Sequence, residues 1–150
     1  MASITFKSLL ILSLYVAWGT DGTRVASYNP WVSLYWITTG KSIGGTTVMA
    51  KENTLDRITA LKLMTTGGYT LLKENNKGKI QKGFYADLVI LDKDYFSVAD
   101  EALPAINSLL TIVDGKVVYG TADYESEAPA KVPVIPAWSP VKYYGGYQYK

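Results

Sequence analysis

The residue best placed to do chemistry is Asp21, which lies in a turn-forming stretch, Gly19–Thr23, directly after an apolar run that ends at Trp18. A carboxylate can bind a hard metal ion and can take a proton from a metal-bound water. In barrels of parallel strands, catalytic side chains stand at the carboxyl ends of the strands, where Asp21 would lie if the apolar run is a strand. An aspartate between Thr20 and Gly22 is also typical of a plain turn, so the residue types alone leave both interpretations open.

The other ligands of a catalytic metal site are missing from the sequence. The 150 residues include no histidine and no cysteine. Catalytic zinc sites usually take three protein ligands, with histidines among them, and keep one position open for water. Asp21 would supply one ligand only, and one ligand does not hold a catalytic metal. We therefore expect no metal ion to bind stably to this chain alone.

The composition is that of an ordinary globular domain, with 48% hydrophobic and 19% charged residues. The net charge is +2, with no long run of one sign. A nucleic-acid-binding face needs clustered basic residues, so the charge pattern predicts no nucleic-acid partner. Without cysteine there is no disulfide framework, and the sequence carries no redox evidence about the compartment.

The N-terminal apolar run, Ser8–Trp18, has more than one interpretation. It is too short to span a bilayer, which takes about 20 residues, so we predict no transmembrane segment. It suits the hydrophobic region of a signal peptide, with Ala17-x-Gly19 as a cleavage site. The protein would be secreted or periplasmic if residues 1–19 act as that signal. The run also suits a buried parallel strand, and the sequence leaves localisation open.

A first helix is predicted to begin at Pro30, because proline fits the first helical position and keeps Asn29 out of the helix. Val32, Tyr35 and Trp36 follow at helical spacing. The glycine- and threonine-rich stretch 38–47 is predicted to be a loop.

A second helix is predicted over Arg57–Thr66, with Asp56 as its N-cap. Its apolar positions Ile58, Leu61, Met64 and Thr65 recur at intervals of three and four residues, which predicts one buried face. Gly67-Gly68 is predicted to end this helix.

The spacing of apolar residues changes to that of strands after Lys82. Ala86–Leu91 is predicted to be a buried strand, and Leu109–Val113 and Lys116–Tyr119 flank Asp114-Gly115, a strong hairpin signal. From Ala128 onward the prolines favour an extended tail over regular structure.

Three segments carry a resemblance to a known family: Gly19–Trp31 (GTDGTRVASYNPW), Gly78–Asp92 (G-x-I-x-x-G-x-x-A-D-L-V-I-L-D) and the hairpin Leu109–Tyr119. In this order and spacing they resemble the C-terminal part of the metal-dependent amidohydrolase superfamily, in the branch called amidohydrolase family 3. The tail around Trp138-Ser139-Pro140 and Gly145-Gly146-Tyr147 is similar to that branch too. The resemblance covers nearly everything after residue 16, whereas residues 1–15 show no clear match.

The resemblance implies an α/β fold, the C-terminal remnant of a (β/α)8 barrel joined to a small β-sandwich domain. Residues 16–72 would be the last barrel strand and its helices, with Arg57–Thr66 as the eighth barrel helix. Residues 73–125 would form the composite β-sandwich, and residues 126–150 a tail rich in proline and tyrosine.

The resemblance also implies roles for residues near the end of the last barrel strand. Asp21 matches the aspartate that binds the metal and acts as general base. Arg24, Tyr28, Asn29 and Trp31 would lie on the following loop and face the substrate, although packing against the barrel rim explains them equally well. Asp87, at the entry to a strand, is interpreted as structural.

Relatives of this kind hydrolyse carbon–nitrogen bonds other than peptide bonds, in small amide-like molecules, with a divalent metal that is most often zinc. Seven barrel strands and the family's histidines are absent from this chain, so we expect it to be inactive alone. We also expect self-association, or assembly with a complementing chain that supplies the barrel, because the face with Ile58, Leu61 and Met64 would lack its partner. The alternative is a stand-alone secreted or periplasmic β-rich module with a binding or structural role.

Overall fold

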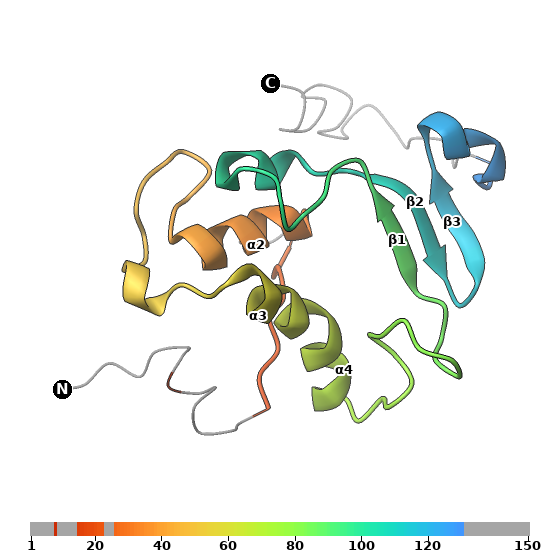
Figure 1. The fold of residues 1–150 in the computed structure, drawn as a ribbon, viewed down its shortest axis with the longest axis horizontal. Coiled ribbons are helices and arrows are strands. Elements are labelled where there is room, and N and C mark those ends of the chain that lie inside the picture. Colours follow the sequence, from red (N-terminus) through yellow and green to blue (C-terminus); the bar gives the residue numbers. More distant parts are fainter. Residues whose placement is uncertain (1–7, 9–14, 23–25, 131–150) are drawn as a thin grey trace.

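The computed structural model describes residues 8, 15–22 and 26–130 of the chain. Helices form one part of the molecule and a three-stranded antiparallel sheet forms the other (Figure 1). The α and β elements are α2 (Pro30–Thr39), α3 (Arg57–Lys62), the π-helical η2 (Leu63–Gly67), α4 (Gly68–Leu71), β1 (Leu88–Leu91), β2 (Ser108–Val113) and β3 (Lys116–Gly120). Short 3-10 helices are η1 (Lys51–Asn53), η3 (Asp100–Ala105) and η4 (Ala122–Glu127). The mixed α and β content predicted from the sequence is confirmed.

Helix α2 begins where the sequence predicts. Asn29 caps it, since the side-chain Oδ1 accepts a hydrogen bond from the backbone N–H of Trp31 at 2.8 Å, and Pro30 takes the first helical position. The helix continues to Thr39, into the stretch predicted as loop, before Gly40 ends it in the left-handed conformation with φ 73°.

Helix α3 also begins as predicted, because the Asp56 carboxylate accepts hydrogen bonds from the backbone N–H and hydroxyl of Thr59 at 2.9 and 2.6 Å. The predicted end at Gly67-Gly68 is wrong, since the helix widens into η2 and continues as α4 to Leu71. Gly67 instead allows the backbone of Val16 to pass close to the helix, because a Cβ at position 67 would lie 2.7 Å from the carbonyl oxygen of Val16.

The faces that these helices bury differ in part from those predicted. Helix α3 and η2 bury Ala60 and Leu63, whereas Ile58 is 57% exposed, and Leu61 and Met64 are only partly buried. The apolar residues of this helix form two overlapping stripes, and contacts with the neighbouring elements determine which stripe is buried.

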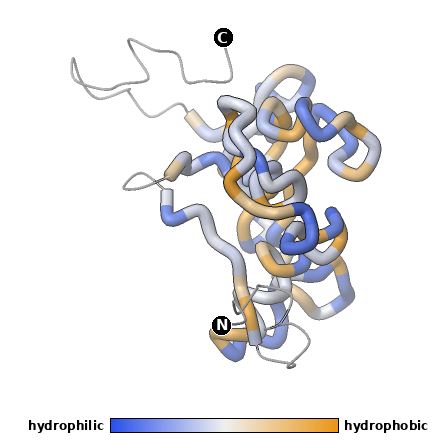
Figure 2. The backbone as a smooth tube through the Cα atoms, turned by 90° about the vertical axis from the view of Figure 1, so that its left-hand side faces the viewer, coloured by the Kyte–Doolittle hydropathy of each residue, from blue (hydrophilic) through white to orange (hydrophobic). Residues whose placement is uncertain are grey.

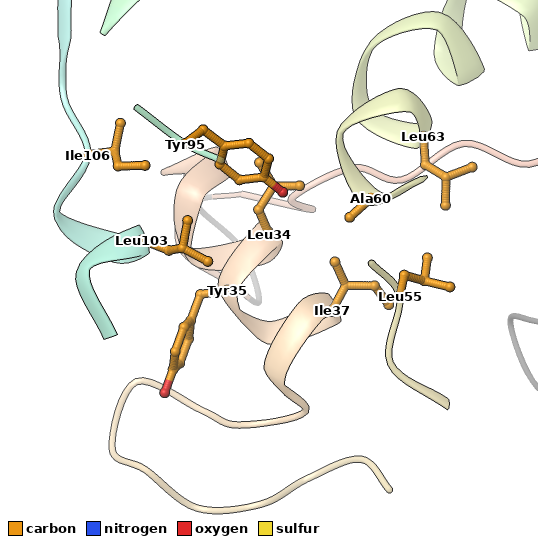
Figure 3. Close-up of a cluster of buried hydrophobic side chains, with 9 residues drawn as sticks. All are labelled: Leu34, Tyr35, Ile37, Leu55, Ala60, Leu63, Tyr95, Leu103 and Ile106. Carbon is orange, nitrogen blue, oxygen red and sulfur yellow. The ribbon is translucent and has the colours of Figure 1, made fainter. Parts of the chain in front are cut away.

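The hydrophobic core lies among the helices rather than between helices and sheet. Leu34 and Ile37 of α2, Leu103 of η3 and Ile106 are its most completely buried side chains. Figure 3 shows them converging with residues of the α3 helix and with Tyr95. Of the α2 residues at the predicted helical spacing, Tyr35 is buried and Trp36 is partly exposed.

The segment 15–22 follows one side of the molecule, hydrophobic where it starts and hydrophilic where it ends (Figure 2). The backbone N–H of Trp18 donates to the carbonyl oxygen of Leu63 at 3.1 Å, and its ring lies 5.2 Å from that of Trp36. Between Tyr15 and Gly22 the only β-type pairing is an isolated bridge from Gly22 to Ala26. The buried parallel strand predicted there is therefore not formed in the described part of the segment.

The sheet has the order β1-β2-β3 and is antiparallel throughout. The predicted hairpin is confirmed, with both turn residues, Asp114 and Gly115, at positive φ of 50° and 73°. This is the geometry that Asp-Gly favours in tight hairpins. Strand β1 starts at Leu88, two residues later than predicted.

A sandwich needs a second sheet facing the first, and the described residues contain one three-stranded sheet only. The tail from residue 131 lies outside the described residues. Within the described ranges, no helix is long and apolar enough to cross a membrane.

Candidate functional site

Asp21 lies in an exposed turn. Its φ is 47°, a left-handed conformation that aspartate tolerates better than most residues, and the N–H of Gly22 donates to the Thr20 hydroxyl at 3.1 Å. No described residue forms a hydrogen bond or ion pair with the Asp21 carboxylate. The carboxylate is thus accessible and without a partner in the described part of the chain.

The residues around Asp21 do not fit a metal ion. No group of three or more His, Cys, Asp or Glu side chains lies close enough together among the described residues, and the sequence has no histidine or cysteine at all. Three protein ligands are the usual minimum for a catalytic zinc. The other predicted site residue on this loop, Arg24, lies outside the described residues.

The remaining predicted substrate contacts meet at one cleft. Tyr28, Asn29 and Trp31 line a cavity of about 460 Å³ that separates the start of α2 from the α3 helix and the sheet. Asp21 does not line this cleft. The structure therefore brings three of the predicted residues together at one cleft. Asp21 is not among the residues that line it, although the next residue, Gly22, lies against the backbone of Tyr28.

Asn29 is 4% exposed, and both ends of its side-chain amide are engaged within the protein. Oδ1 caps α2 through the Trp31 N–H, and Nδ2 donates to the carbonyl oxygen of Pro104 at 3.3 Å. The side chain thus fixes the start of α2 against η3. A substrate contact by Asn29 stays a prediction.

Trp31 and Tyr28 stand differently at the cleft. The Trp31 ring packs against Tyr95, with 5.8 Å between ring centroids, so one of its sides supports the core. Tyr28 is exposed. Of the three predicted contacts that line the cleft, Tyr28 is therefore the most accessible to a ligand.

The residues of the opposite wall of the cleft were not predicted from the sequence. Its residues come from elements far apart in the chain: Leu61, Met64 and Thr65 from the α3 helix and η2, and Val89, Ser108 and Thr111 from the sheet. Strict alternation would put Ser108 and Thr111 on opposite faces of β2, but the pairing of β1 with β2 shifts register between Ile90 and Leu91, and both residues line the same cleft. Only the packed structure shows this irregularity and which face of the sheet meets the helix.

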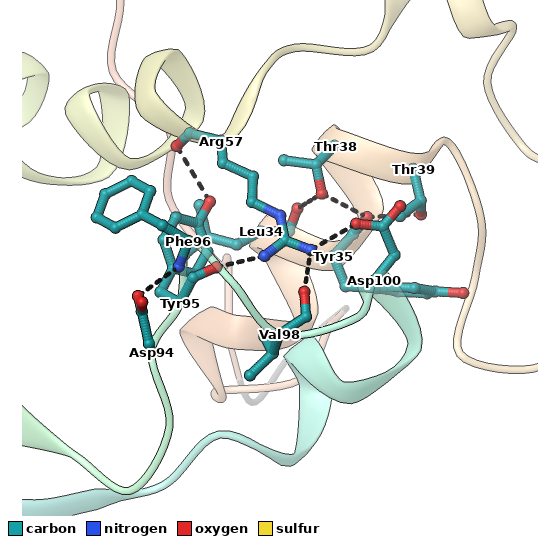
Figure 4. Close-up of polar contacts among 10 residues, drawn as sticks. All are labelled: Leu34, Tyr35, Thr38, Thr39, Arg57, Asp94, Tyr95, Phe96, Val98 and Asp100. Atoms are coloured by element: carbon teal, nitrogen blue, oxygen red, sulfur yellow. Dashed lines mark hydrogen bonds and ion pairs between the residues drawn. The ribbon is translucent and has the colours of Figure 1, made fainter.

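Arg57 ties α3 to the loop before η3 (Figure 4). Its guanidinium donates to the carbonyl oxygens of Tyr95 and Val98, the latter at 2.7 Å, and pairs with the Asp100 carboxylate at 2.6 Å. Burial raises the pKa of the Tyr95 phenol to about 12, the nearby Arg57 charge opposing this only in part. These groups hold the framework on which the cleft is built.

The comparisons with known proteins decide the family. The model described as the amidohydrolase family matches residues 2–119, most of the chain. The chain belongs to the amidohydrolase family. The matching part of the chain includes Asp21 and every residue that lines the cleft. It also includes nearly all of residues 1–15, where the sequence motifs showed no resemblance, and it stops before the proline-rich tail.

One curated relative of this amidohydrolase chain is the putative amidohydrolase YtcJ of Bacillus subtilis (strain 168), which is 34% identical over 61 residues. The aligned stretch is 40% of this chain and 12% of YtcJ, so the similarity spans a small part of that relative. No solved structure matches this chain.

Proposed function

We propose that this amidohydrolase chain is the C-terminal part of a metal-dependent hydrolase that acts on carbon–nitrogen bonds other than peptide bonds, in small amide-like molecules. The observation that carries the proposal is the family match over residues 2–119. The partial coverage of YtcJ supports the view that the chain is one part of a larger catalytic unit.

In this proposal, the segment that ends at Asp21 and the helix beginning at Arg57 belong to the last strand–helix unit of a (β/α)8 barrel. The position of segment 15–22 beside this helix supports the proposal, since the Trp18 N–H donates to the Leu63 carbonyl oxygen and the Val16 carbonyl oxygen lies close to Gly67. Strands β1–β3 then belong to the small β domain. The second sheet of that domain would come from residues other than those described.

Asp21 is the carboxylate that we propose for the metal centre of the complete enzyme. Its exposure and its lack of a described partner support this, since a carboxylate free of internal hydrogen bonds is available to a ligand. The remaining ligands must come from outside this chain, which has no histidine. We therefore propose that a divalent metal, with zinc favoured, needs those further residues to bind stably.

The first test is to sequence the genomic DNA and transcript upstream of the Met1 codon. An in-frame extension that encodes His-x-His and further histidines is expected. A genuine stop codon before Met1, with no complementing histidine-bearing chain encoded nearby, would count against a working enzyme. It would favour the alternative, a stand-alone β-rich module with a binding or structural role.

The second test uses the 150-residue chain and, where the extension exists, the longer protein. Zinc content and hydrolysis of a panel of small amides are measured for wild type, Asp21→Ala and Asp114→Ala. Asp114 is a matched control because it is also an exposed turn aspartate at positive φ. We expect no turnover from the short chain, and loss of metal and activity from the longer protein only with Asp21→Ala. Metal-dependent turnover by the short chain would overturn the expectation of inactivity.

The exposed apolar side chains favour a proposal of assembly for this chain. Large apolar side chains stand open to solvent, among them Ile58 at 57%, Leu72 at 69% and Ile80 at 91% exposure, and apolar surface of this kind favours association. We propose self-association or binding of a complementing barrel chain. Light scattering on the purified chain tests this, and a monomer at all concentrations would speak against it.

A further inference from the structure

The cleft beside Tyr28 and Trp31 differs chemically from a metal-hydrolase centre. Its lining residues include no Asp, Glu, Lys or Arg side chain. We propose that this cleft is a binding site for a neutral, mainly apolar small molecule that carries one hydrogen-bonding group, such as an aromatic amide or alcohol.

Because the lining residues carry no charged side chain, the cleft favours a neutral ligand over an ionised one. An ionised ligand would leave water without meeting an opposite charge, which costs far more than burying an apolar group. A neutral ligand avoids this cost. The cleft volume of about 460 Å³ is within the range of roughly 300–1,000 Å³ that small-molecule sites occupy.

The floor and walls provide the apolar contact. Leu34 and Ile106 are buried core residues that also reach the cleft, so the floor is held by the packing of α2 against η3. Trp31 adds an aromatic wall that Tyr95 supports from behind. Met64 faces the cleft from η2 and, being unbranched, can adapt to the shape of a ligand.

The sheet side supplies the hydrogen bonds. Ser108 and Thr111 line the cleft from β2, and within the described residues neither hydroxyl has a hydrogen-bond partner. Thr65 stands on the facing wall, where its hydroxyl donates to the carbonyl oxygen of Leu61 at 2.9 Å and keeps its oxygen free to accept. A ligand amide or hydroxyl between these walls can both donate and accept.

This inference does not rest on the proposed metal centre. Asp21 does not line the cleft, and ligand binding is measured without a metal or turnover. Failure of one proposal therefore leaves the other standing.

The test is a fluorescence titration of the purified chain with the neutral probe N-phenyl-1-naphthylamine, repeated with the anionic probe 1-anilinonaphthalene-8-sulfonate. We expect saturable binding of the neutral probe and binding of the anionic probe at least about tenfold weaker, because the cleft offers no cation to the sulfonate. Equal affinity for the two probes would overturn the inference.

Two tryptophan variants locate the site. Val89→Trp places a large ring in the cleft and is expected to weaken the neutral probe by at least about tenfold, or roughly 1.4 kcal/mol. Val118→Trp is the matched control, because Val118 has the same 48% exposure as Val89 and lies on β3 away from the cleft. Equal binding by both variants would place the probe elsewhere and refute the site.

A third variant keeps the test decisive if Val89→Trp does not fold. Thr111→Val removes the hydroxyl with little change of shape, so the neutral probe should bind as before. Displacement of the probe by acetanilide, a neutral aromatic amide, should then need about tenfold more competitor. If Thr111→Val and wild type need the same acetanilide concentration to displace the probe, the proposed hydrogen bond from the ligand to Thr111 is refuted.

Discussion

Arg57 and Tyr95 are joined by two hydrogen bonds of opposite sense: the Arg57 guanidinium donates to the Tyr95 carbonyl oxygen, and the Tyr95 hydroxyl donates to the Arg57 carbonyl oxygen at 3.1 Å. The guanidinium carbon also lies 5.8 Å from the centre of the Tyr95 ring. This pair fastens the first turn of α3 to the loop that leads into η3, and Tyr95 in turn supports Trp31 at the cleft.

Arg57→Ala should lower the free energy of unfolding by about 2–3 kcal/mol, because it leaves the Tyr95 and Val98 carbonyl oxygens without their charged donor. The measurement is urea denaturation. Asp100→Asn is the control, since the Asp100 side chain is 55% exposed and a surface ion pair contributes about 0–1 kcal/mol. Equal losses in the two variants would show that the ion pair, and not the backbone contacts, carries the stability.

Tyr95 should make the protein lose stability in alkaline solution. Burial raises its pKa from 10.0 to about 12, so the folded state holds the phenol proton more tightly than the unfolded chain. The resulting stability is fully present below about pH 10 and is lost as the pH rises toward 12. Denaturation curves at several pH values should show a shallower alkaline loss for Tyr95→Phe than for wild type.

Asp56→Ala should destabilise the protein by about 1 kcal/mol at neutral pH, the usual cost of removing an N-cap. The hydrogen bond from the Thr59 hydroxyl, with that from the Thr59 backbone, lowers the pKa of the Asp56 carboxyl. Its ionised form is therefore stabilised in the folded state, and that stability is lost as the pH falls through the lowered pKa. The difference between wild type and Asp56→Ala should shrink in acid. Asp56→Asn keeps a capping oxygen but carries no titratable group, so residue 56 should contribute no loss of stability in acid in this variant.

Asn29→Ala should cost about 2–3 kcal/mol, since it removes the cap of α2 and leaves the Pro104 carbonyl oxygen without its donor. Asn29→Ser keeps a capping oxygen and should recover about half of the loss. Thermal or urea unfolding measures both. Unchanged stability in Asn29→Ala, together with weakened probe binding, would instead assign Asn29 to ligand contact.

Several elements could be predicted because their causes are local. The start of α2 follows from the ring of Pro30, the start of α3 from the carboxylate of Asp56, and the hairpin from the backbone freedom of Asp114-Gly115. Each depends on residues within one turn of the chain, so neighbours in sequence were enough.

Other features could not be predicted because they depend on contacts between distant residues. Glycine is the residue type that commonly ends helices, so Gly67 was predicted to end this one. In the structure the helix continues, and the absence of a side chain at Gly67 makes room for the Val16 carbonyl oxygen. Asn29 was predicted either to face a substrate or to pack against the barrel rim, and its hydrogen bond to Pro104, 75 residues along the chain, could be seen only in the structure.

The sequence by itself determined the family, the start of α2 and of α3, the hairpin, and the absence of the nitrogen and sulfur ligands of a hydrolytic metal site. Tertiary structure alone decided which stripe of α3 is buried, that Tyr28 and Trp31 share a cleft with Thr111, and that Asp21 is not among the residues that line it. The physical reason is that caps and turns are set by short-range hydrogen bonds and backbone sterics. A cleft exists only where elements far apart in the chain pack against one another and leave a space unfilled.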